Sequence, residues 1–342
     1  MSTASIRIDG LDALYECPED DVVLRAALRA GLPFPYECNS GSCGSCKFEL
    51  LEGEVESLWP EAPGLSERDR KKNRRLGCQS RANGACRIRF RPDPACVPRV
   101  RPRRFTARFA ARRRLTHDMA EFRFMADVPA EFLPGQYALL RLPEVVGLRA
   151  YSMSNLPNRE GAWEFQIKNF PGGAGSRALF ERLETGAPIE LDGPYGMAYL
   201  REDAPRDIVC IAGGSGMAPM IAIARGMARV PQLARRRLLF FYGGRGPDDI
   251  VGWDVLEELS NGGASIEFHP VISMPELDTQ DRWRGPVGFV HEHVGRTLGM
   301  LDDFGAYEYY LAGPPPMVDA TLKLLVMERK VPIAQIHYDR FY

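Results

Sequence analysis

The chain has 342 residues, of which 45% are hydrophobic and 26% are charged, and its formal net charge is −1. This composition excludes a disordered chain, and the near-neutral charge gives no reason to expect a nucleic-acid partner. The longest apolar stretch is broken by Gly and Pro, so we expect no membrane span. Eight cysteines without a signal peptide predict a cytoplasmic protein whose thiols bind metal rather than form disulfides.

Residues 1–95 predict a small α+β domain. Short strands alternate with one helix over residues 20–31, whose apolar side chains recur every three or four residues and which ends at Gly31. Residues 96–104 follow as a linker rich in proline and arginine. We expect its arginines to be solvated, and docking onto the first domain is the alternative.

Four cysteines of the first domain have a distinctive spacing. Four residues separate Cys38 from Cys43, two separate Cys43 from Cys46, and Cys78 lies well downstream. This is the plant-type ferredoxin spacing for a [2Fe-2S] cluster. Structural zinc usually needs a second C-x2-C pair, and a Rieske centre needs histidines near the cysteines. The sequence therefore predicts a cluster on these four thiols, with Cys86 as the alternative fourth ligand.

Residues 105–203 predict a small antiparallel barrel, because alternating strands are separated by Pro and Gly turns. Two motifs stand out in it. R-x-Y-S comprises Arg149, Tyr151 and Ser152, and G-x-x-S runs from Gly173 to Ser176. The second motif opens a predicted helix, whose N-terminus suits a pyrophosphate group.

Residues 204–342 alternate strand and helix, which predicts a mostly parallel sheet with helices on both faces. Gly213, Gly214 and Gly216 lie between a buried strand and a helix, where the backbone can approach a dinucleotide closely. The segments "FYGGR" and "LAGPPPM" follow downstream.

These motifs, in this order, resemble the ferredoxin-NAD(P)H reductase family. The resemblance implies that Arg149 binds the FAD pyrophosphate, that Tyr151 packs on the isoalloxazine, and that Ser152 lies near its reactive nitrogen. It also assigns further residues to the cofactors: Gly173, Gly175 and Ser176 to the pyrophosphate, Gly213, Gly214 and Gly216 to the dinucleotide, and Arg245, Gly313 and Pro314 to the nicotinamide nucleotide. By the same resemblance Asp339 and Phe341 cover the flavin, and we name them with Ser152 as catalytic candidates.

The family often has a cysteine beside the hydride-transfer position, and this chain has Ala312. NADPH-dependent members carry Ser-Arg after the third strand of the nucleotide domain. Here Met274 follows Ser273, and Asp248 and Asp249 lie near the second strand. The absence of a cation where a phosphate would bind favours NADH as the electron donor.

The full chain resembles the reductase components of bacterial multicomponent oxygenases, and the cysteine region is most similar to toluene and related aromatic monooxygenase reductases. Such a chain passes electrons from NADH through FAD to the [2Fe-2S] cluster, because nicotinamide gives electrons in pairs and the cluster accepts them singly. No Glu-x-x-His pair of a di-iron site occurs, so a separate oxygenase or small ferredoxin must be the partner of a monomeric reductase.

Two alternatives remain open from the sequence alone. One is a reductase for a Rieske ring-hydroxylating dioxygenase or another acceptor, and the other is a non-enzymatic metal-binding module. The charge of the first domain bears on where the partner docks, because residues 1–60 hold eleven acids and four bases. We therefore expect docking through acidic groups, at a rate that falls as salt rises.

Overall fold

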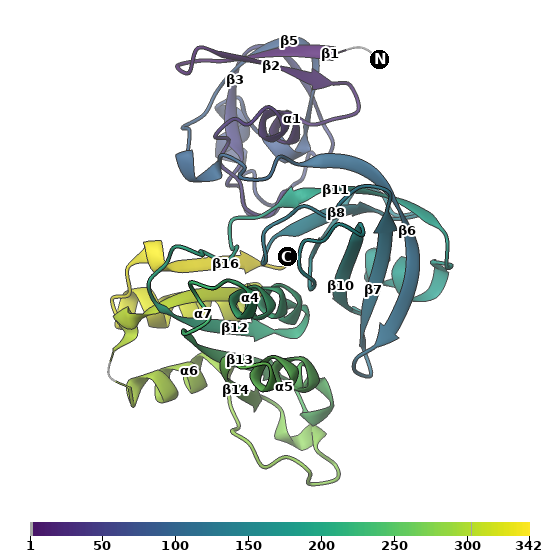
Figure 1. Ribbon diagram of the computed structural model, residues 1–342. Coiled ribbons are helices and arrows are strands. Elements are labelled where there is room, and N and C mark those ends of the chain that lie inside the picture. Colours follow the sequence, from purple (N-terminus) through teal and green to yellow (C-terminus); the bar gives the residue numbers. More distant parts are fainter. Residues whose placement is uncertain (1–2, 302) are drawn as a thin grey trace.

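The computed structural model describes residues 3–301 and 303–342 and contains three sheets that follow one another along the chain (Figure 1). The first sheet packs above a barrel, the barrel lies beside a parallel sheet, and the C-terminus lies where the three parts approach one another (Figure 1). Among the described residues, no helix has the length and apolar character needed to cross a membrane.

The first sheet has the strand order β2-β1-β5-β3-β4, with β1 parallel to β5 and the other pairs antiparallel. Its elements are β1 (Thr3–Ile8), β2 (Ala13–Pro18), α1 (Val23–Arg29), β3 (Lys47–Ser57), α2 (Glu67–Lys71), β4 (Arg74–Leu76) and β5 (Ser80–Arg89). The apolar face of α1 packs on this sheet through buried Leu24 and Leu28. This β-grasp arrangement and the predicted helix are confirmed. The short helix α2 was missed.

The second sheet is antiparallel and has the order β10-β7-β6-β11-β8-β9. Its elements are β6 (Arg103–Arg114), β7 (Met119–Ala126), β8 (Tyr137–Arg141), β9 (Arg149–Ser152), β10 (Ala162–Lys168), α3 (Ala174–Arg177) and β11 (Pro188–Tyr195). A single bridge between Met153 and Phe165 links the two end strands. It closes the predicted barrel around a core of aromatic side chains that includes Trp163 and Phe124.

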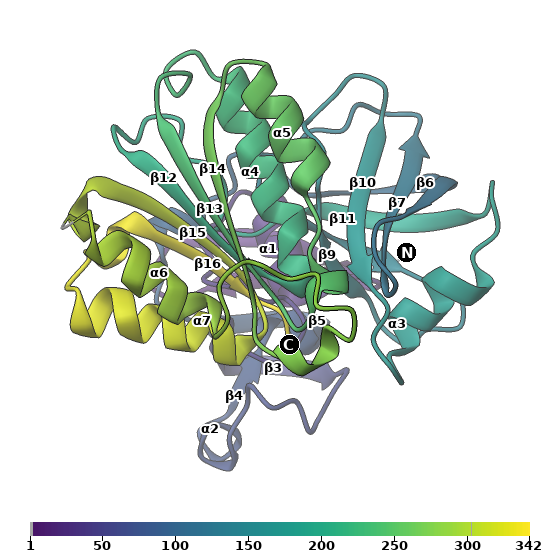
Figure 2. The same cartoon turned by 90° about the horizontal axis from the view of Figure 1, so that it is seen from below.

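The third sheet is wholly parallel and has the order β14-β13-β12-β15-β16. Its elements are β12 (Asp207–Gly213), α4 (Met217–Arg229), β13 (Arg237–Gly244), α5 (Trp253–Asn261), β14 (Ser265–Ile272), α6 (Val290–Gly299), β15 (Tyr307–Gly313), α7 (Pro315–Leu322) and β16 (Ile336–Arg340). Helices α4 and α5 cover one face, and α6 and α7 cover the other (Figure 2). The order reverses between β12 and β15, which places a crevice at the carboxyl ends of these strands.

A buried ion-pair network, here named the cluster-side joint, connects the first sheet to the barrel; it comprises Asp21, Arg25, Arg29, Arg104 and Asp192. Arg29 donates two hydrogen bonds to Asp192, at 2.7 and 3.0 Å, and a third to Asp21 at 2.9 Å. Both carboxylates are 1% exposed. Burial alone would raise the pKa of Asp21, but Arg29, Arg104 and Arg25 outweigh it, and the pKa is lowered.

Arg104 of the linker takes part in this contact, so the expectation of a solvated side chain is wrong for this residue, whereas Arg99, Arg101 and Arg103 are exposed as expected. Arg104 lies 2.7 Å from Asp21, and Arg99 lies over the ring of Tyr199. The physical reason is that buried carboxylates need cationic partners, and the linker passes directly over them. β6 also begins inside the predicted linker, at Arg103, which pairs with Gly193. The division at residues 95, 104 and 203 otherwise stays a prediction.

Candidate functional site

The loop between α1 and β3 carries three of the four predicted cysteine ligands, Cys38, Cys43 and Cys46, and lies next to the fourth, Cys78. The Sγ atoms of Cys46 and Cys78 lie 3.4 Å apart, and the backbone N–H of Cys43 points at the Sγ of Cys38 over 3.4 Å. Further N–H groups, from Ser40 and Ser45, point at Cys38 and Cys43. Such N–H groups stabilise negative charge on sulfur, as an iron–sulfur cluster requires.

The protonation of these thiols favours metal binding. A hydrogen bond from Cys43, with the N–H of Ser40, lowers the pKa of Cys38 to about 5 despite burial. A hydrogen bond from Cys78 lowers the pKa of Cys46 in the same way. A lowered pKa favours the thiolate, which is the form that binds a metal.

Two glycines allow the loop to take this shape. Gly41 and Gly44 have φ angles of +96° and +77°, where a side chain would be strained. A Cβ on Gly44 would also lie 2.6 Å from the carbonyl oxygen of Gly64. The donor set and the loop therefore fit the predicted cluster.

The alternative fourth ligand, Cys86, lies elsewhere. It belongs to β5, and its Sγ contacts the carbonyl oxygen of Glu54 at 3.3 Å. Its pKa is raised by burial. Cys78 is adjacent to Cys46, whereas Cys86 faces a carbonyl group of β3. The geometry therefore favours Cys78 as the fourth ligand.

The two barrel motifs meet in space. Arg149, Tyr151 and Ser152 lie on β9, and a Cβ built on Gly175 would lie 2.7 Å from the Tyr151 hydroxyl and 3.1 Å from Arg149 Cγ. Position 175 therefore accepts only glycine without rearrangement. Burial raises the pKa of Tyr151 to about 12, so this phenol stays neutral at physiological pH.

The G-x-x-S segment forms a tight turn at the start of α3. The hydroxyl of Ser176 accepts the N–H of Phe170 at 3.1 Å, and the helix begins directly after Gly173. Phe170 itself is 72% exposed. The serine thus shapes the turn, while the helix start keeps backbone N–H groups available for a phosphate. These residues and β9 fit the pyrophosphate of FAD.

The glycines of the third domain pack the ends of β12 and β15 together. A Cβ on Gly216 would lie 2.0 Å from the carbonyl oxygen of Ala312, and one on Gly213 would lie 2.7 Å from Met317 Sδ and 3.5 Å from Pro314. Gly313 has a φ of +151°. These close approaches leave backbone, rather than side chains, at the crevice of the switch point, which fits a dinucleotide.

The C-terminal strand enters the same region. The N–H of Phe341 donates to Gly313 at 2.9 Å, and its ring packs partly against the core of the nucleotide domain. Asp339 on β16 is 6% exposed, and within the described chain its Oδ2 has no hydrogen-bond partner. Burial, with the nearby Glu37 and Cys38, raises its pKa to about 7. A buried carboxyl that titrates near neutrality is typical of a functional group.

One residue that the sequence did not single out links this strand to the cysteine loop. Glu37, next to Cys38, pairs with Arg340 at 3.0 Å, and its carbonyl oxygen accepts the Tyr137 hydroxyl at 2.7 Å. The loop is therefore held against β8 and β16, beside the β9 motif. No sequence signal could identify Glu37, because its partners lie about a hundred and three hundred residues away.

A second ion-pair group, here named the nucleotide-side joint, connects the barrel to the nucleotide domain; it comprises Asp118, Lys168, Arg245 and Asp249. Lys168 Nζ lies 3.1 Å from Asp118 and 2.9 Å from Asp249, and Arg245 reaches Asp118 at 3.2 Å. Arg245, predicted to line the nicotinamide nucleotide, is therefore held by the barrel at the end of β13.

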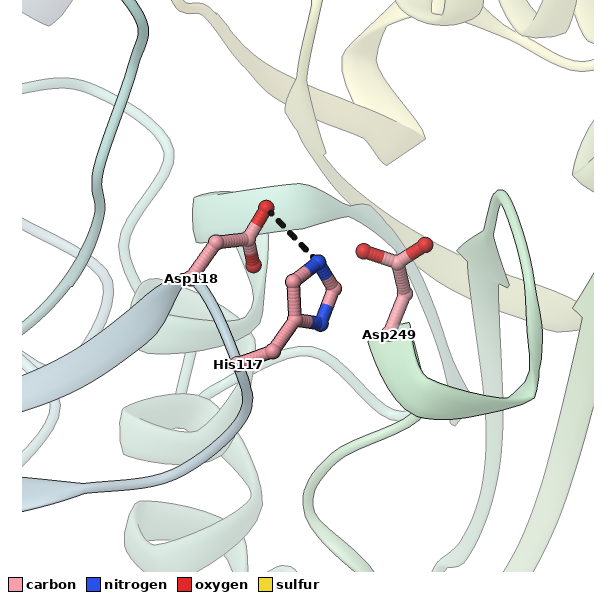
Figure 3. Close-up of side chains that lie close together, drawn as sticks. All are labelled: His117, Asp118 and Asp249. Atoms are coloured by element: carbon pink, nitrogen blue, oxygen red, sulfur yellow. Dashed lines mark ion pairs between the residues drawn. The ribbon is translucent and has the colours of Figure 1, made fainter. Parts of the chain in front are cut away.

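His117 lies within this joint and, with Asp118 and Asp249, forms a group whose spacing would suit a metal ion (Figure 3). Figure 3 shows the imidazole beside Asp118, with Asp249 facing both from the nucleotide domain. However, Lys168 and Arg245 together already neutralise both carboxylates. The group is therefore an ion-pair cluster between two domains.

Comparisons with known proteins agree with this geometry. Residues 6–83 match the 2Fe-2S iron-sulfur cluster binding domain, residues 106–199 match the oxidoreductase FAD-binding domain, and residues 210–323 match the oxidoreductase NAD-binding domain. The chain is 44% identical to the ferredoxin--NAD(P)(+) reductase CarAd of Metapseudomonas resinovorans, over 98% of this chain and 99% of the relative.

Two further matches cover nearly the full length. The ferredoxin--NAD(+) reductase component of an alkene monooxygenase system from Xanthobacter autotrophicus is 41% identical over 96% of this chain and 97% of its own. The solved structure of the ferredoxin reductase in carbazole 1,9a-dioxygenase superposes with a TM-score of 0.90 at 40% identity, covering 100% of this chain and 99% of that one.

The fold and the site together define a flavin- and iron–sulfur-dependent electron-transfer reductase with sites for a [2Fe-2S] cluster, FAD and NAD. The chain belongs to the family of ferredoxin–NAD(P) reductases that serve as reductase components of multicomponent oxygenase systems. The resemblance drawn from the sequence is confirmed. The alternative of a non-enzymatic metal-binding module is wrong.

Proposed function

We propose that this reductase takes electrons from NADH and delivers them singly to the oxygenase, or its small ferredoxin, of a hydrocarbon or aromatic monooxygenase. When bound, FAD would accept one hydride with its two electrons, and the cluster would pass electrons on one at a time. The observation that carries the proposal is the convergence of three elements: Glu37 holds the cysteine loop against β8 and β16, next to the Arg149–Ser152 strand.

Each predicted residue has a role in this proposal. Cys38, Cys43, Cys46 and Cys78 hold the cluster, and Arg149, Gly173, Gly175 and Ser176 hold the FAD pyrophosphate. Tyr151 and Ser152 face the isoalloxazine. Gly213, Gly214, Gly216, Arg245, Gly313 and Pro314 receive the dinucleotide. Asp339, with its pKa near 7, holds a proton close to the flavin, and Phe341 excludes water from the crevice.

Support for NADH over NADPH comes from the end of β14. Met274 follows that strand and is 42% exposed, where a phosphate-binding cation would be needed. The nearby Arg282 is already paired with Asp248 at 2.7 Å. A 2′-phosphate would therefore meet a carboxylate and a neutralised arginine, whereas a 2′-hydroxyl can donate to the carboxylate.

The monooxygenase partner is supported by the alkene monooxygenase relative. A second candidate is the oxygenase of a ring-hydroxylating dioxygenase, which the relative CarAd and the carbazole dioxygenase reductase structure favour. We further propose that the reductase is a cytoplasmic monomer; for the compartment, the support is that none of the eight cysteines forms a disulfide, as expected in a reducing environment.

Steady-state assays with purified acceptors test this proposal. We expect kcat/KM for NADH to exceed that for NADPH at least about tenfold, the factor that one lost charged hydrogen bond produces. Met274→Arg, combined with Asp248→Asn, should lower the ratio of kcat/KM for NADH to kcat/KM for NADPH. The matched control is Met300→Arg, because Met300 is exposed at the end of α6. Equal use of both nucleotides by the wild type contradicts the donor assignment, and product formation with a candidate hydroxylase decides the partner.

A further inference from the structure

The cysteine loop has two sides, and only one faces the flavin. On that side Glu37 contacts Tyr137 and Arg340. On the other side the N–H of Gly64 donates to the carbonyl oxygen of Gly41 at 2.9 Å. The segment that follows β3 therefore covers the loop on the side away from the flavin, where an external protein can approach.

This covering segment has an exposed apolar centre. Leu58 and Trp59 are 39% and 42% exposed. The indole of Trp59 lies against the loop, because a Cβ on Gly41 would be 3.0 Å from its Cε3 atom. Trp59 thus touches the cysteine loop with one part of its ring and solvent with another. Half-exposed tryptophan is the residue type that most often carries binding energy in protein interfaces.

The helix α2 adds positive charge to the same surface. Arg68, Lys71 and Lys72 are exposed, and within residues 3–301 and 303–342 none of the three forms an ion pair. Figure 2 shows α2 and β4 projecting from the molecule, away from the helices of the nucleotide domain. We name Leu58, Trp59, Arg68, Lys71 and Lys72 together the α2 face.

Neighbouring acids do not cancel this charge. Asp69 is buried and is neutralised by Lys47 at 2.9 Å and Arg74 at 3.1 Å. These pairs, with the hydrogen bonds of Ser66, fix α2 next to the cysteine loop. Two exposed acids, Glu61 and Glu67, lie in the segment, so the three unpaired cations leave it net positive.

Several acids of the first sixty residues form ion pairs elsewhere. Asp21 faces the barrel through Arg104, and Asp9 pairs with Arg87 and Arg89 on the sheet. They do not surround the exposed side of the cysteine loop. The structure therefore gives no support to docking through an acidic surface of this domain, which was expected from the charge of residues 1–60.

We propose that the α2 face is the docking surface for the one-electron acceptor, and that this acceptor presents an acidic surface around its own redox centre. The inference rests on the proposed function, since it names the partner chemistry of the same cluster. Opposite charge accelerates a brief encounter and orients it, while Trp59 supplies the apolar contact at its centre. Small interfaces of this kind suit electron-transfer partners that must separate again.

Two forms of one probe protein test the charge. Native cytochrome c is basic, and succinylated cytochrome c has the same haem with an acidic surface. The wild type should reduce the succinylated form faster at low salt, and the advantage should shrink as salt rises. The variant R68E/K71E/K72E should lose about tenfold in kcat/KM for the succinylated form and gain for the native form.

A matched control carries the same change of charge far from the cluster. The variant R229E/R235E/R236E alters three arginines at the loop end of α4 and β13, which are exposed or half-exposed and without ion pairs among the described residues. It should change the rates of reduction of native and of succinylated cytochrome c by no more than about twofold, which is the effect expected from net charge alone. If both triple variants change the rates equally, or neither does, the α2 face is not the docking surface.

Trp59→Ala should slow reduction of both probes, with an unchanged visible spectrum showing that the cluster is intact. NADH-driven reduction of ferricyanide, a small acceptor that needs no docking surface, should be unchanged in every variant. A wild type that fails to reduce ferricyanide contradicts the proposed function instead. The two failures are therefore distinguishable.

Discussion

The two joints of the molecule are built from the same residue types in different surroundings. In the cluster-side joint, Asp21 and Asp192 are 1% exposed and Arg29 is bidentate to Asp192. In the nucleotide-side joint, Arg245 has a side chain 55% exposed and is shared between two carboxylates. Buried ion pairs resist separation strongly, whereas exposed pairs contribute little.

This difference matches what each joint must do. Electron transfer from flavin to cluster benefits from a fixed distance, and the cluster-side joint, with Glu37 and Tyr137, holds the first domain against the barrel. A dinucleotide must enter and leave on every turnover. In the nucleotide-side joint Lys168 pairs with the buried Asp249, but the pairs of the exposed Arg245 can rearrange, which would free Arg245 for its proposed contact with the nucleotide. Substitutions in and around the two joints test this difference.

The largest effect is expected at the cluster itself. Cys78→Ser removes one ligand of the cluster. Reduction of cytochrome c by NADH should therefore be abolished, while reduction of ferricyanide continues. The measurement is the ratio of the two activities, with the iron content. Cys86→Ser is the control and should keep both. A loss in the Cys86 variant together with retention in the Cys78 variant would reverse the ligand assignment.

Asp192→Ala should destabilise the protein by about 3–5 kcal/mol, because it leaves the buried Arg25 and Arg29 to share a single carboxylate, that of Asp21. Urea unfolding measures the change. Glu190→Gln, two residues away, breaks an exposed pair with Arg141 and should cost less than about 1 kcal/mol. Equal costs for the two variants would mean that burial does not distinguish the joints as described.

Asp339 lies on the C-terminal strand and connects pH to stability. Its pKa is raised from 3.8 to about 7, so the folded state binds a proton that the unfolded chain releases, and its contribution to stability falls as pH rises from about 4 to 7. Asp339→Asn removes this penalty. At pH 8 the variant should be more stable than the wild type by about 1–3 kcal/mol, and at pH 4 nearly equal. A difference independent of pH contradicts the raised pKa.

The smallest effect on stability is expected at the nucleotide-side joint. Arg245→Ala should change the free energy of unfolding by less than about 1 kcal/mol, because the arginine is mostly exposed. It should raise KM for NADH about tenfold with kcat little changed, since a charged hydrogen bond to the nucleotide is lost. Stopped-flow reduction of the flavin gives both quantities. Arg284→Ala, at an exposed arginine paired with Asp281, is the control and should leave both quantities unchanged.

The sequence predicted the local parts of the site and missed the contacts between them. Cysteine spacing and the glycines near residues 175, 213 and 313 are local constraints, so the three folds and the cofactors could be predicted. The pairing of Arg29 with Asp192, or of Glu37 with Arg340, joins residues far apart in the chain and leaves no periodic pattern. Arg104 of the linker was misjudged for the same reason, because the carboxylate of Asp192 lies 88 residues further along the chain.

Anaerobic titration with NADH, followed at the flavin and iron–sulfur absorption bands, tests the central claim most directly. The account predicts uptake of about three electrons per chain, two by the flavin and one by the cluster. Bleaching of the flavin with no change at the iron–sulfur bands, in protein that contains its iron and sulfide, would contradict it.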